Sequence, residues 1–256
     1  MNYKSKTTDI AEKTGLSITT VSRVLNGKAE QYRIGEKSQH LVRKAAEELN
    51  YVPNHYAAYL KTGKSKSIGL IIPSLDNPFF ASIASSINSE VSKNGYSVMI
   101  GATNENLENE KKEIKQFVSR NIEGLIIVPS GKDINHILKI RDQGLPLIFI
   151  DRYIEHSKIP FISTDNFHGA ITATNYLLEY GHTSIICIQG VRDSSPNIQR
   201  VNGFKHAMKK AGINDYKIVG DDFSVQNGYL ETKLLLQRKE RPTAIFTLSN
   251  TIAMGS

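Results

Sequence analysis

The chain has 256 residues, of which 39% are hydrophobic and 22% are charged. These proportions are ordinary for a globular protein, so general disorder is excluded as the default state. No apolar run approaches the roughly 18 residues of a membrane helix, and no apolar segment follows the basic start as in a secretory signal. The single cysteine, Cys187, excludes an internal disulfide framework and is typical of a reducing compartment. We therefore expect a cytoplasmic protein with no membrane span.

The net charge of +7 is concentrated in the first quarter of the sequence. Residues 1–66 contain 12 Lys and Arg against 6 Asp and Glu, whereas residues 67–256 contain 20 against 19. A positive charge confined to a short segment favours a module that binds a polyanion, attached to a nearly neutral body. A solvated basic face is the alternative interpretation.

The first 50 residues predict a small helical module. A short helix is expected over residues 9–14, and Gly15 is suited to end it in the left-handed conformation. Ser17 can cap a second helix over residues 18–25. Apolar residues at helical spacing predict a third helix over residues 36–50. No strand pattern interrupts this segment.

From residue 67 onward, short β-branched strands alternate with amphipathic helices. The expected strands are residues 68–73, 98–102, 124–129, 146–151, 184–189, 218–220 and 244–248. The expected helices are residues 80–94, 107–121, 133–143, 168–180, 199–211 and 225–238. This alternation predicts parallel sheets with right-handed crossovers. A pause at residues 161–166 suggests two α/β halves.

The first two predicted helices have the pattern of a helix-turn-helix. Apolar Ile10, Leu16 and Val21 fall where two helices would cross tightly. The positions left facing outward on the second helix are Ile18, Thr19, Ser22 and Arg23. A helix with short polar residues and one arginine fits the major groove of DNA. An ordinary helical hairpin with an exposed polar face is the alternative.

These residues closely resemble the headpiece of LacI-family regulators. The matching segments are DIA at 9–11, GLS at 15–17, TVSRVLNG at 20–27, ELNYVPN at 48–54, IGLIIP at 68–73, NPFF at 77–80, IDR at 150–152 and TDN at 164–166. The resemblance implies an all-α helix-turn-helix headpiece and an α/β periplasmic-binding-protein-like sensor of two Rossmann-like lobes. Family members continue beyond the position of Ser256, so we expect the second lobe to be truncated. The implied domains are 1–53 (headpiece), 54–66 (hinge helix and linker), 67–162 (first lobe) and 163–256 (second lobe, incomplete).

The resemblance also implies DNA-contacting residues. Ile18, Thr19 and Arg23 match base-reading positions, and the positions that usually contact phosphates are Thr8, Ser17, Ser22 and Asn26. Residues 55–60 match a hinge helix, in which Leu60 matches an apolar wedge inserted into the minor groove; packing of Leu60 on the headpiece is the alternative. The implied partner is a near-palindromic double-stranded operator bound by a homodimer. The loop at residues 28–35 departs from the family because it is longer, and Gly35 stands where a serine commonly caps the third helix.

A small-molecule site is implied between the two lobes. The matching positions are Phe79, Phe80, Asp151, Arg152, Asp165, Arg200, Phe223 and Asn250. Several follow predicted strands, at the carboxyl ends where ligands of parallel sheets bind. Carboxylate, guanidinium and aromatic groups together suit a hydroxyl-rich ring, so a sugar is the expected effector. Two alternatives stay open: Phe79 and Phe80 as core residues, and Asp165 as a helix cap.

The hypothesis is a transcription regulator, most simply a repressor, whose operator affinity is controlled by the effector. A solute-binding protein is the first alternative, but the headpiece and the lack of a signal peptide argue against it. An α/β enzyme is the second alternative. The segment Gly63-Lys64-Ser65 resembles the end of a phosphate-binding loop but lacks the required glycine, since residue 58 is alanine. The sequence suggests no catalytic nucleophile with a neighbouring general base, and it contains no residues at metal-ligand spacing. We therefore expect neither enzymatic activity nor a cofactor.

Overall fold

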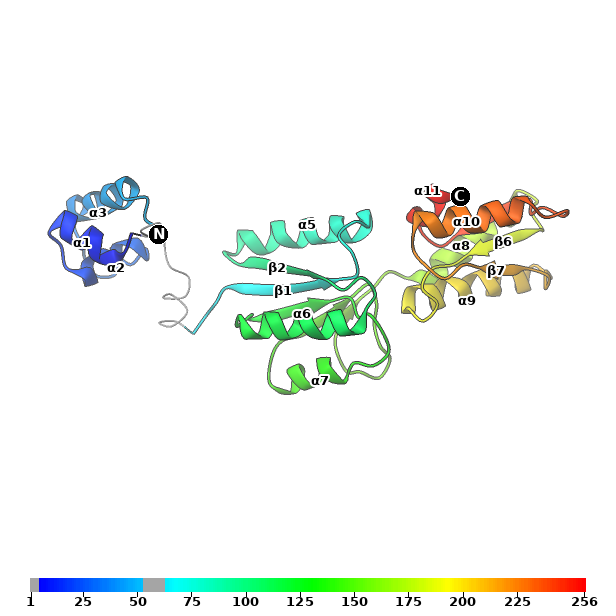
Figure 1. Ribbon diagram of the computed structural model, residues 1–256, viewed down its shortest axis with the longest axis horizontal. Helices are drawn as coiled ribbons and strands as arrows, with labels where there is room; N and C mark the ends of the chain where they lie inside the picture. The colour runs from blue at the N-terminus through cyan, green and yellow to red at the C-terminus, as the bar shows by residue number, and fades with distance from the viewer. Residues whose placement is uncertain (1–4, 53–62) are drawn as a thin grey trace. The chain divides into compact units, whose positions relative to one another are not determined.

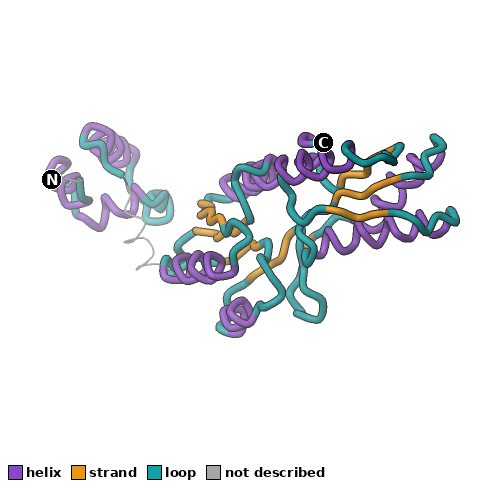
Figure 2. The backbone as a smooth tube through the Cα atoms, turned by 45° about the vertical axis from the view of Figure 1, so that its right-hand side comes forward, coloured by secondary structure: helices purple, strands orange, loops and turns teal. Residues whose placement is uncertain are grey.

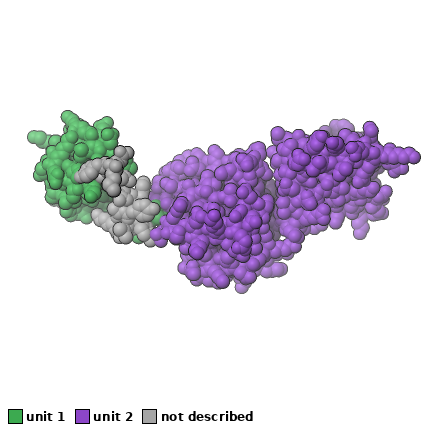
Figure 3. Space-filling view, in the orientation of Figure 1, with its two compact units in different colours: residues 1–65 green, residues 66–256 purple. Residues whose placement is uncertain are grey.

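The computed structural model describes residues 5–52 and 63–256, and it divides into two compact units, residues 1–65 and 66–256 (Figure 3). The predicted hinge helix at residues 55–60, including Leu60, lies outside the described residues. The domain boundaries proposed from the sequence therefore stay predictions. None of the helices in the described ranges combines the length and the hydrophobicity needed to span a bilayer.

Unit 1 is the predicted helical module (Figure 1). Its helices are α1 (Thr7–Thr14), α2 (Ile18–Leu25) and α3 (Glu36–Glu48). Gly15 ends α1 with a φ of 67°, a conformation that glycine adopts without steric cost. The Ser17 hydroxyl accepts a hydrogen bond from the Thr20 N–H at 3.1 Å and so caps α2. The three helices enclose a small core of Ile10, Ala11, Val21, Val24, Ala29, Val42 and Ala45.

The first lobe of unit 2 is a five-stranded parallel sheet in the order β2-β1-β3-β4-β5. Its strands are β1 (Ser67–Ile72), β2 (Ser97–Ala102), β3 (Gly124–Ile127), β4 (Leu147–Ile150) and β5 (Phe161–Ile162), and its helices are α5 (Pro78–Lys93), α6 (Leu107–Ser119) and α7 (Asn135–Asp142). Alternating residues of β1 face opposite sides: Leu70 packs with Phe80 of α5, and Ile71 packs with Phe117 of α6. Both faces are covered, which explains the continuous apolar strands.

The second lobe of unit 2 is a three-stranded parallel sheet in the order β7-β6-β8. Its strands are β6 (Ile185–Ile188), β7 (Lys217–Val219) and β8 (Ala244–Thr247), and its helices are α8 (Asn166–Glu179), α9 (Ser195–Lys210), α10 (Val225–Leu236) and α11 (Asn250–Gly255). Cys187 packs with Phe204 of α9 on one face, and Ile188 packs with Leu235 of α10 on the other. Figure 2 shows helices alongside the strands of both sheets. Burial raises the pKa of the Cys187 thiol, which keeps this thiol unreactive.

One strand of the first sheet differs from the sequence expectation. The predicted pause at residues 161–166 contains β5, whose Phe161 pairs with Phe149 of β4. The strand is only two residues long, and its side chains are 52% and 66% exposed, so it lacks the buried apolar run by which the other strands were predicted. The Phe161 ring stacks on Tyr153 with centroids 4.3 Å apart. An aromatic contact therefore supplements the short pairing at this edge.

The close packing of α8 against α9 gives a first prediction. A Cβ added at Gly203 would lie 2.3 Å from the Phe167 carbonyl oxygen, a backbone atom that cannot move away cheaply. Gly203→Ala should therefore lower the free energy of unfolding by about 1–3 kcal/mol, measured by urea denaturation. Gly169→Ala on α8 is the matched control, because its Cβ would meet no atom within 4 Å. Equal stability of the two variants would contradict the close approach.

Candidate functional site

The outward face of α2 carries the positions predicted to read bases. Ile18 is 51% exposed and Thr19 is also exposed, both directly after the Ser17 cap. Ser22 and Arg23 are half-buried. The Arg23 guanidinium carbon lies 3.8 Å from the centroid of the Tyr32 ring, over its face. The structure thus presents an apolar, a hydroxyl and a cationic group along one short helix.

Of the residues predicted to contact phosphates, three lie at the ends of α1 and α2 and Ser22 lies inside α2, and none of them is buried. Thr8, in the first turn of α1, donates to the Asp9 carboxylate at 3.3 Å. Ser17 contacts the Thr20 hydroxyl at 2.8 Å, and Asn26 donates to the Ser22 carbonyl at 2.6 Å. Thr8, Ser17 and Asn26 are exposed to solvent, and Ser22 is half-buried.

The loop that follows α2 is ordered by its own contacts. Ala29 is only 4% exposed and packs in the headpiece core. The Lys28 N–H donates to the Arg23 carbonyl at 2.9 Å, and the Ile34 N–H donates to the Ala29 carbonyl at 2.9 Å. Gly35 precedes α3 without a side-chain cap, as its lack of a side chain requires.

Unit 2 contains a cleft of about 510 Å³ at the carboxyl ends of its strands. The loops after β1, β2, β4, β7 and β8 and the start of α9 supply its walls. The lining residues are Pro73, Ser74, Asp76, Asn77, Phe79, Phe80, Asn104, Glu105, Asp151, Arg152, Pro196, Arg200, Asp222, Phe223, Ser224, Val225, Ser249, Asn250 and Thr251. Seven of the eight residues predicted for the effector site therefore lie together.

Asp165 is the exception, because it caps α8, as the alternative prediction said. Its carboxylate accepts a hydrogen bond from the His168 N–H at 3.1 Å, at the start of α8, and it contacts the His168 ring at 2.8 Å. These contacts lower the pKa of the Asp165 carboxyl. Asp165 does not line the cleft of about 510 Å³, because the helix start holds its side chain outside.

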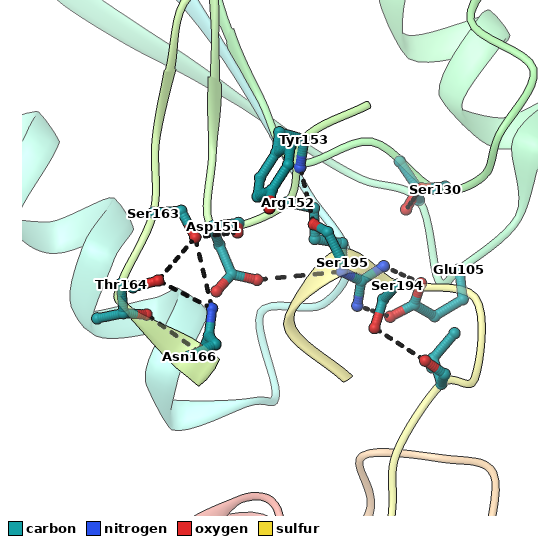
Figure 4. A network of polar contacts seen from close by, with 12 residues as sticks. Glu105, Ser130, Asp151, Arg152, Tyr153, Ser163, Thr164, Asn166, Ser194 and Ser195 are labelled. Carbon is teal, nitrogen blue, oxygen red and sulfur yellow. Dashed lines mark hydrogen bonds and ion pairs between the residues drawn. The ribbon is translucent and has the colours of Figure 1, made fainter. Parts of the chain in front are cut away.

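Arg152 lines the cleft but its charge is used within the protein (Figure 4). Both terminal nitrogens donate to the Glu105 carboxylate at 2.6 Å, and the arginine is only 4% exposed. Glu105 and the preceding Asn104 have φ values of 57° and 51°, in the left-handed region. Such conformations cost of order 1–3 kcal/mol each for non-glycine residues, so the bidentate pair holds a strained loop at the cleft wall.

Asp151 places a buried carboxylate at the end of β4. Its φ is 60°, and a three-residue turn is closed by the Arg152 N–H, which donates to the Ile150 carbonyl at 2.6 Å. The Asp151 side chain is only 8% exposed. Burial raises the pKa of this carboxyl, while the charges of Arg152 and Arg200 oppose that shift. The site thus holds an acceptor group that is poorly solvated.

The aromatic residues of the cleft divide into core and surface. Phe80 is 5% exposed and packs in the core between β1 and α5, as the core alternative described, whereas Phe79 is 42% exposed. Their rings meet edge to face at 5.0 Å. The Phe223 ring lies so close to Gly190 that a Cβ there would be 2.2 Å away. Phe79 and Phe223 therefore offer apolar surface to a ligand.

Arg200 and Asn250 belong to the second-lobe wall. The Arg200 Nε donates to Asn166 at 2.8 Å, and its Nη1 donates to the Leu248 carbonyl at 2.5 Å. Burial lowers the pKa of Arg200, and Asp151 opposes that shift. Asn250 starts α11, and its side-chain oxygen accepts from the Thr251 N–H at 2.9 Å.

Sequence reasoning missed several polar cleft residues. They are Asp76, Asn77, Asn104, Glu105, Asp222, Ser224 and Ser249. All follow the carboxyl end of a predicted strand, which is the signal that would have found them. Across the described ranges, no three His, Cys, Asp or Glu side chains form a group that could hold a metal ion.

The fold and these two sites define a class of protein: a helix-turn-helix DNA-binding module followed by a two-lobed, ligand-binding sensor. Residues 7–54 match the family described as "Bacterial regulatory proteins, lacI family", and residues 65–256 match "Periplasmic binding proteins and sugar binding domain of LacI family". The chain therefore belongs to the LacI family of bacterial transcription regulators.

Individual relatives agree with this assignment. The chain is 31% identical to the HTH-type transcriptional repressor PurR of Proteus mirabilis, covering 97% of this chain and 73% of that protein. It is also 31% identical to the ribose operon repressor of Halalkalibacterium halodurans, covering 97% and 72%. A crystal structure of the lac repressor dimer bound to operator and the anti-inducer ONPF superimposes with a TM-score of 0.86 at 26% identity, covering 99% of this chain and 76% of that one.

The buried Asp151 gives a prediction for stability against pH. A raised folded pKa means that the native state favours the protonated form, so stability is lost as the pH rises from the ordinary value of 3.8 through the folded pKa. Asp151→Asn removes that loss and keeps a residue tolerant of positive φ. The variant should gain thermal stability over the unaltered protein as the pH rises, with the gain vanishing in acid. A difference in melting temperature that is constant with pH would contradict the burial effect.

Proposed function

We propose that this regulator represses transcription by binding a near-palindromic operator as a homodimer, and that an uncharged sugar in the cleft changes its operator affinity. The observation that carries the proposal is that one chain of the LacI family contains both an accessible α2 face and a cleft rich in carboxylates. A protein that binds bacterial operators works in the cytoplasm, where the DNA is. Its relatives are transcription regulators, and we propose no enzymatic role.

On the DNA side, Ile18, Thr19 and Arg23 are proposed to face base edges. Arginine makes the commonest specific contact with guanine, and an apolar side chain suits the thymine methyl group. Contacts to phosphates, which fix register, are proposed for Thr8, Ser17, Ser22 and Asn26. The wedge role of Leu60 and the hinge helix remain part of the proposal. Two headpieces on one near-palindrome match the symmetry of a homodimer.

On the ligand side, the charges of the cleft favour an uncharged polyhydroxylated molecule. Four carboxylates line it, from Asp76, Glu105, Asp151 and Asp222, against the two guanidinium groups of Arg152 and Arg200. Glu105 binds both terminal nitrogens of Arg152, and two nitrogens of Arg200 already have protein acceptors. Few cationic donors are left for a phosphate, while Asp151 is an acceptor for sugar hydroxyls and Phe79 an apolar face.

The two lobes also contact each other at one side of the cleft. The Tyr153 N–H donates to the Ser195 hydroxyl at 3.0 Å, and Gln199 donates to the Tyr153 hydroxyl at 3.3 Å (Figure 4 shows the first of these). A ligand that contacts both walls binds most tightly to one arrangement of the lobes. It can shift the equilibrium between operator-binding and non-binding states only by that difference in affinity.

Arg23→Ala tests the DNA side. Bound duplexes are first selected from a random pool with the full chain at near-physiological salt, and affinities for the selected operator and its point variants are then compared. Loss of Arg23 should weaken discrimination at one base pair by about 1–3 kcal/mol. The control, Arg43→Ala on the exposed face of α3, should leave discrimination intact. Equal losses on specific and random DNA would remove Arg23 from the reading role.

Calorimetric titration tests the ligand side. A panel of neutral monosaccharides and their phosphorylated counterparts is titrated into the chain, and we expect binding heat from a neutral sugar and none from its phosphate. Asp151→Asn should abolish that heat. Glu90→Gln, on the exposed Glu90–Lys93 ion pair of α5, should not change it. Tight binding of the phosphorylated member alone would refute the uncharged-ligand proposal.

A further inference from the structure

The long loop between α2 and α3 brings Tyr32 into contact with α2, the helix proposed to read bases. Ala29 and Ile34 anchor the loop in the headpiece core, and the Ile34 N–H donates to the Ala29 carbonyl at 2.9 Å. Between these anchors Tyr32 is 45% exposed, and Arg33 turns the chain with a φ of 50°. A residue so exposed does not owe its position to burial in the core. Its backbone N–H donates to the Lys28 carbonyl at 3.2 Å, and its ring lies against the Arg23 guanidinium.

The contact leaves every donor of Arg23 available. The guanidinium carbon lies 3.8 Å from the ring centroid, and within residues 5–52 and 63–256 the Arg23 side chain has no ion pair or hydrogen bond. Guanidinium N–H groups point outward in the plane of the group, and the face of an aromatic ring is not a conventional hydrogen-bond acceptor for them. A carboxylate partner would instead occupy two of those N–H groups. The ring therefore restricts the arginine without consuming its hydrogen bonds.

We infer that Tyr32 is a positioning residue that fixes Arg23 for recognition of one base pair, so that the loop at residues 28–35 contributes to operator specificity. This inference rests on the proposed DNA-reading role of Arg23. A free arginine side chain loses much rotamer freedom when it binds in one geometry. A ring that already restricts those rotamers lowers that loss, and it does so only where the fixed geometry matches the base edge. The benefit is therefore specific to the base pair that Arg23 reads.

The test compares Tyr32→Ala and Tyr32→Phe in the full chain. The operator is selected from random duplexes, and the base pair at which Arg23→Ala relaxes discrimination is identified. At that base pair Tyr32→Ala should reduce discrimination about two- to five-fold, the range of an exposed cation–π contact. Tyr32→Phe retains the ring and should restore the discrimination of the unaltered chain. The double variant lacking both side chains should be no worse than Arg23→Ala alone. Affinity for random DNA and its dependence on salt should not change.

Other outcomes overturn the inference in distinguishable ways. Unchanged discrimination in Tyr32→Ala would show that the ring does not position Arg23. Equal loss of affinity for all sequences in both tyrosine variants would assign the hydroxyl to a phosphate contact instead. A lower melting temperature of Tyr32→Ala with uniform loss of affinity would show a structural role only. If Arg23→Ala relaxes no base pair, the proposed reading role fails, and the role of Tyr32 fails with it.

Discussion

The architecture of the cleft depends on one constraint, the burial of the Asp151 carboxylate at the end of β4. Parallel pairing brings the ends of β1, β2, β3 and β4 to one edge of the sheet, and the turn at Asp151 directs its side chain there. The charge is tolerated because Arg152 and Arg200 lie near it, from different lobes. Arg152 in turn requires Glu105, whose loop is held in the left-handed region. The ion pair, the strained loop and the second-lobe arginine thus lie around one buried carboxylate.

The buried Asp151 carboxylate lowers the stability of the folded protein. A buried carboxylate opposes folding at neutral pH, and an apolar residue of similar size would not. In the proposed function a sugar hydroxyl supplies hydrogen bonds to Asp151, and a poorly solvated acceptor gains more from a hydroxyl donor than a solvated one does. Under that proposal, stability and sugar recognition make opposite demands on the Asp151 side chain.

The sequence was sufficient to predict the elements but not the assignment of every side chain. The α2 cap by Ser17, the left-handed Gly15 and seven strands follow local rules, so the two sheets and the headpiece could be foreseen. The strand β5 could not, because two exposed residues form no buried run. Asp165 was ambiguous between a cap and a ligand group, and its contact with the start of α8 shows that it is a cap. Arg152 lines the cleft as the sequence predicted, but its ion pair could not be predicted, because Glu105 lies 47 residues away and no pattern in the sequence joins them.

Arg152 and Arg23, one in each unit, show how the partner of a guanidinium group determines which of its hydrogen-bond donors stay available. Arg152 is held by a carboxylate, which accepts from both terminal nitrogens and makes the group part of the scaffold. Arg23 lies against the face of the Tyr32 ring, and among the described residues its guanidinium has no ion pair or hydrogen bond. Both arrangements restrict a side chain with many rotamers, yet only the second preserves hydrogen-bonding capacity for a partner outside the protein. An arginine against a ring beside an exposed helix is therefore a better candidate for recognition than a buried, ion-paired arginine that lines a cleft.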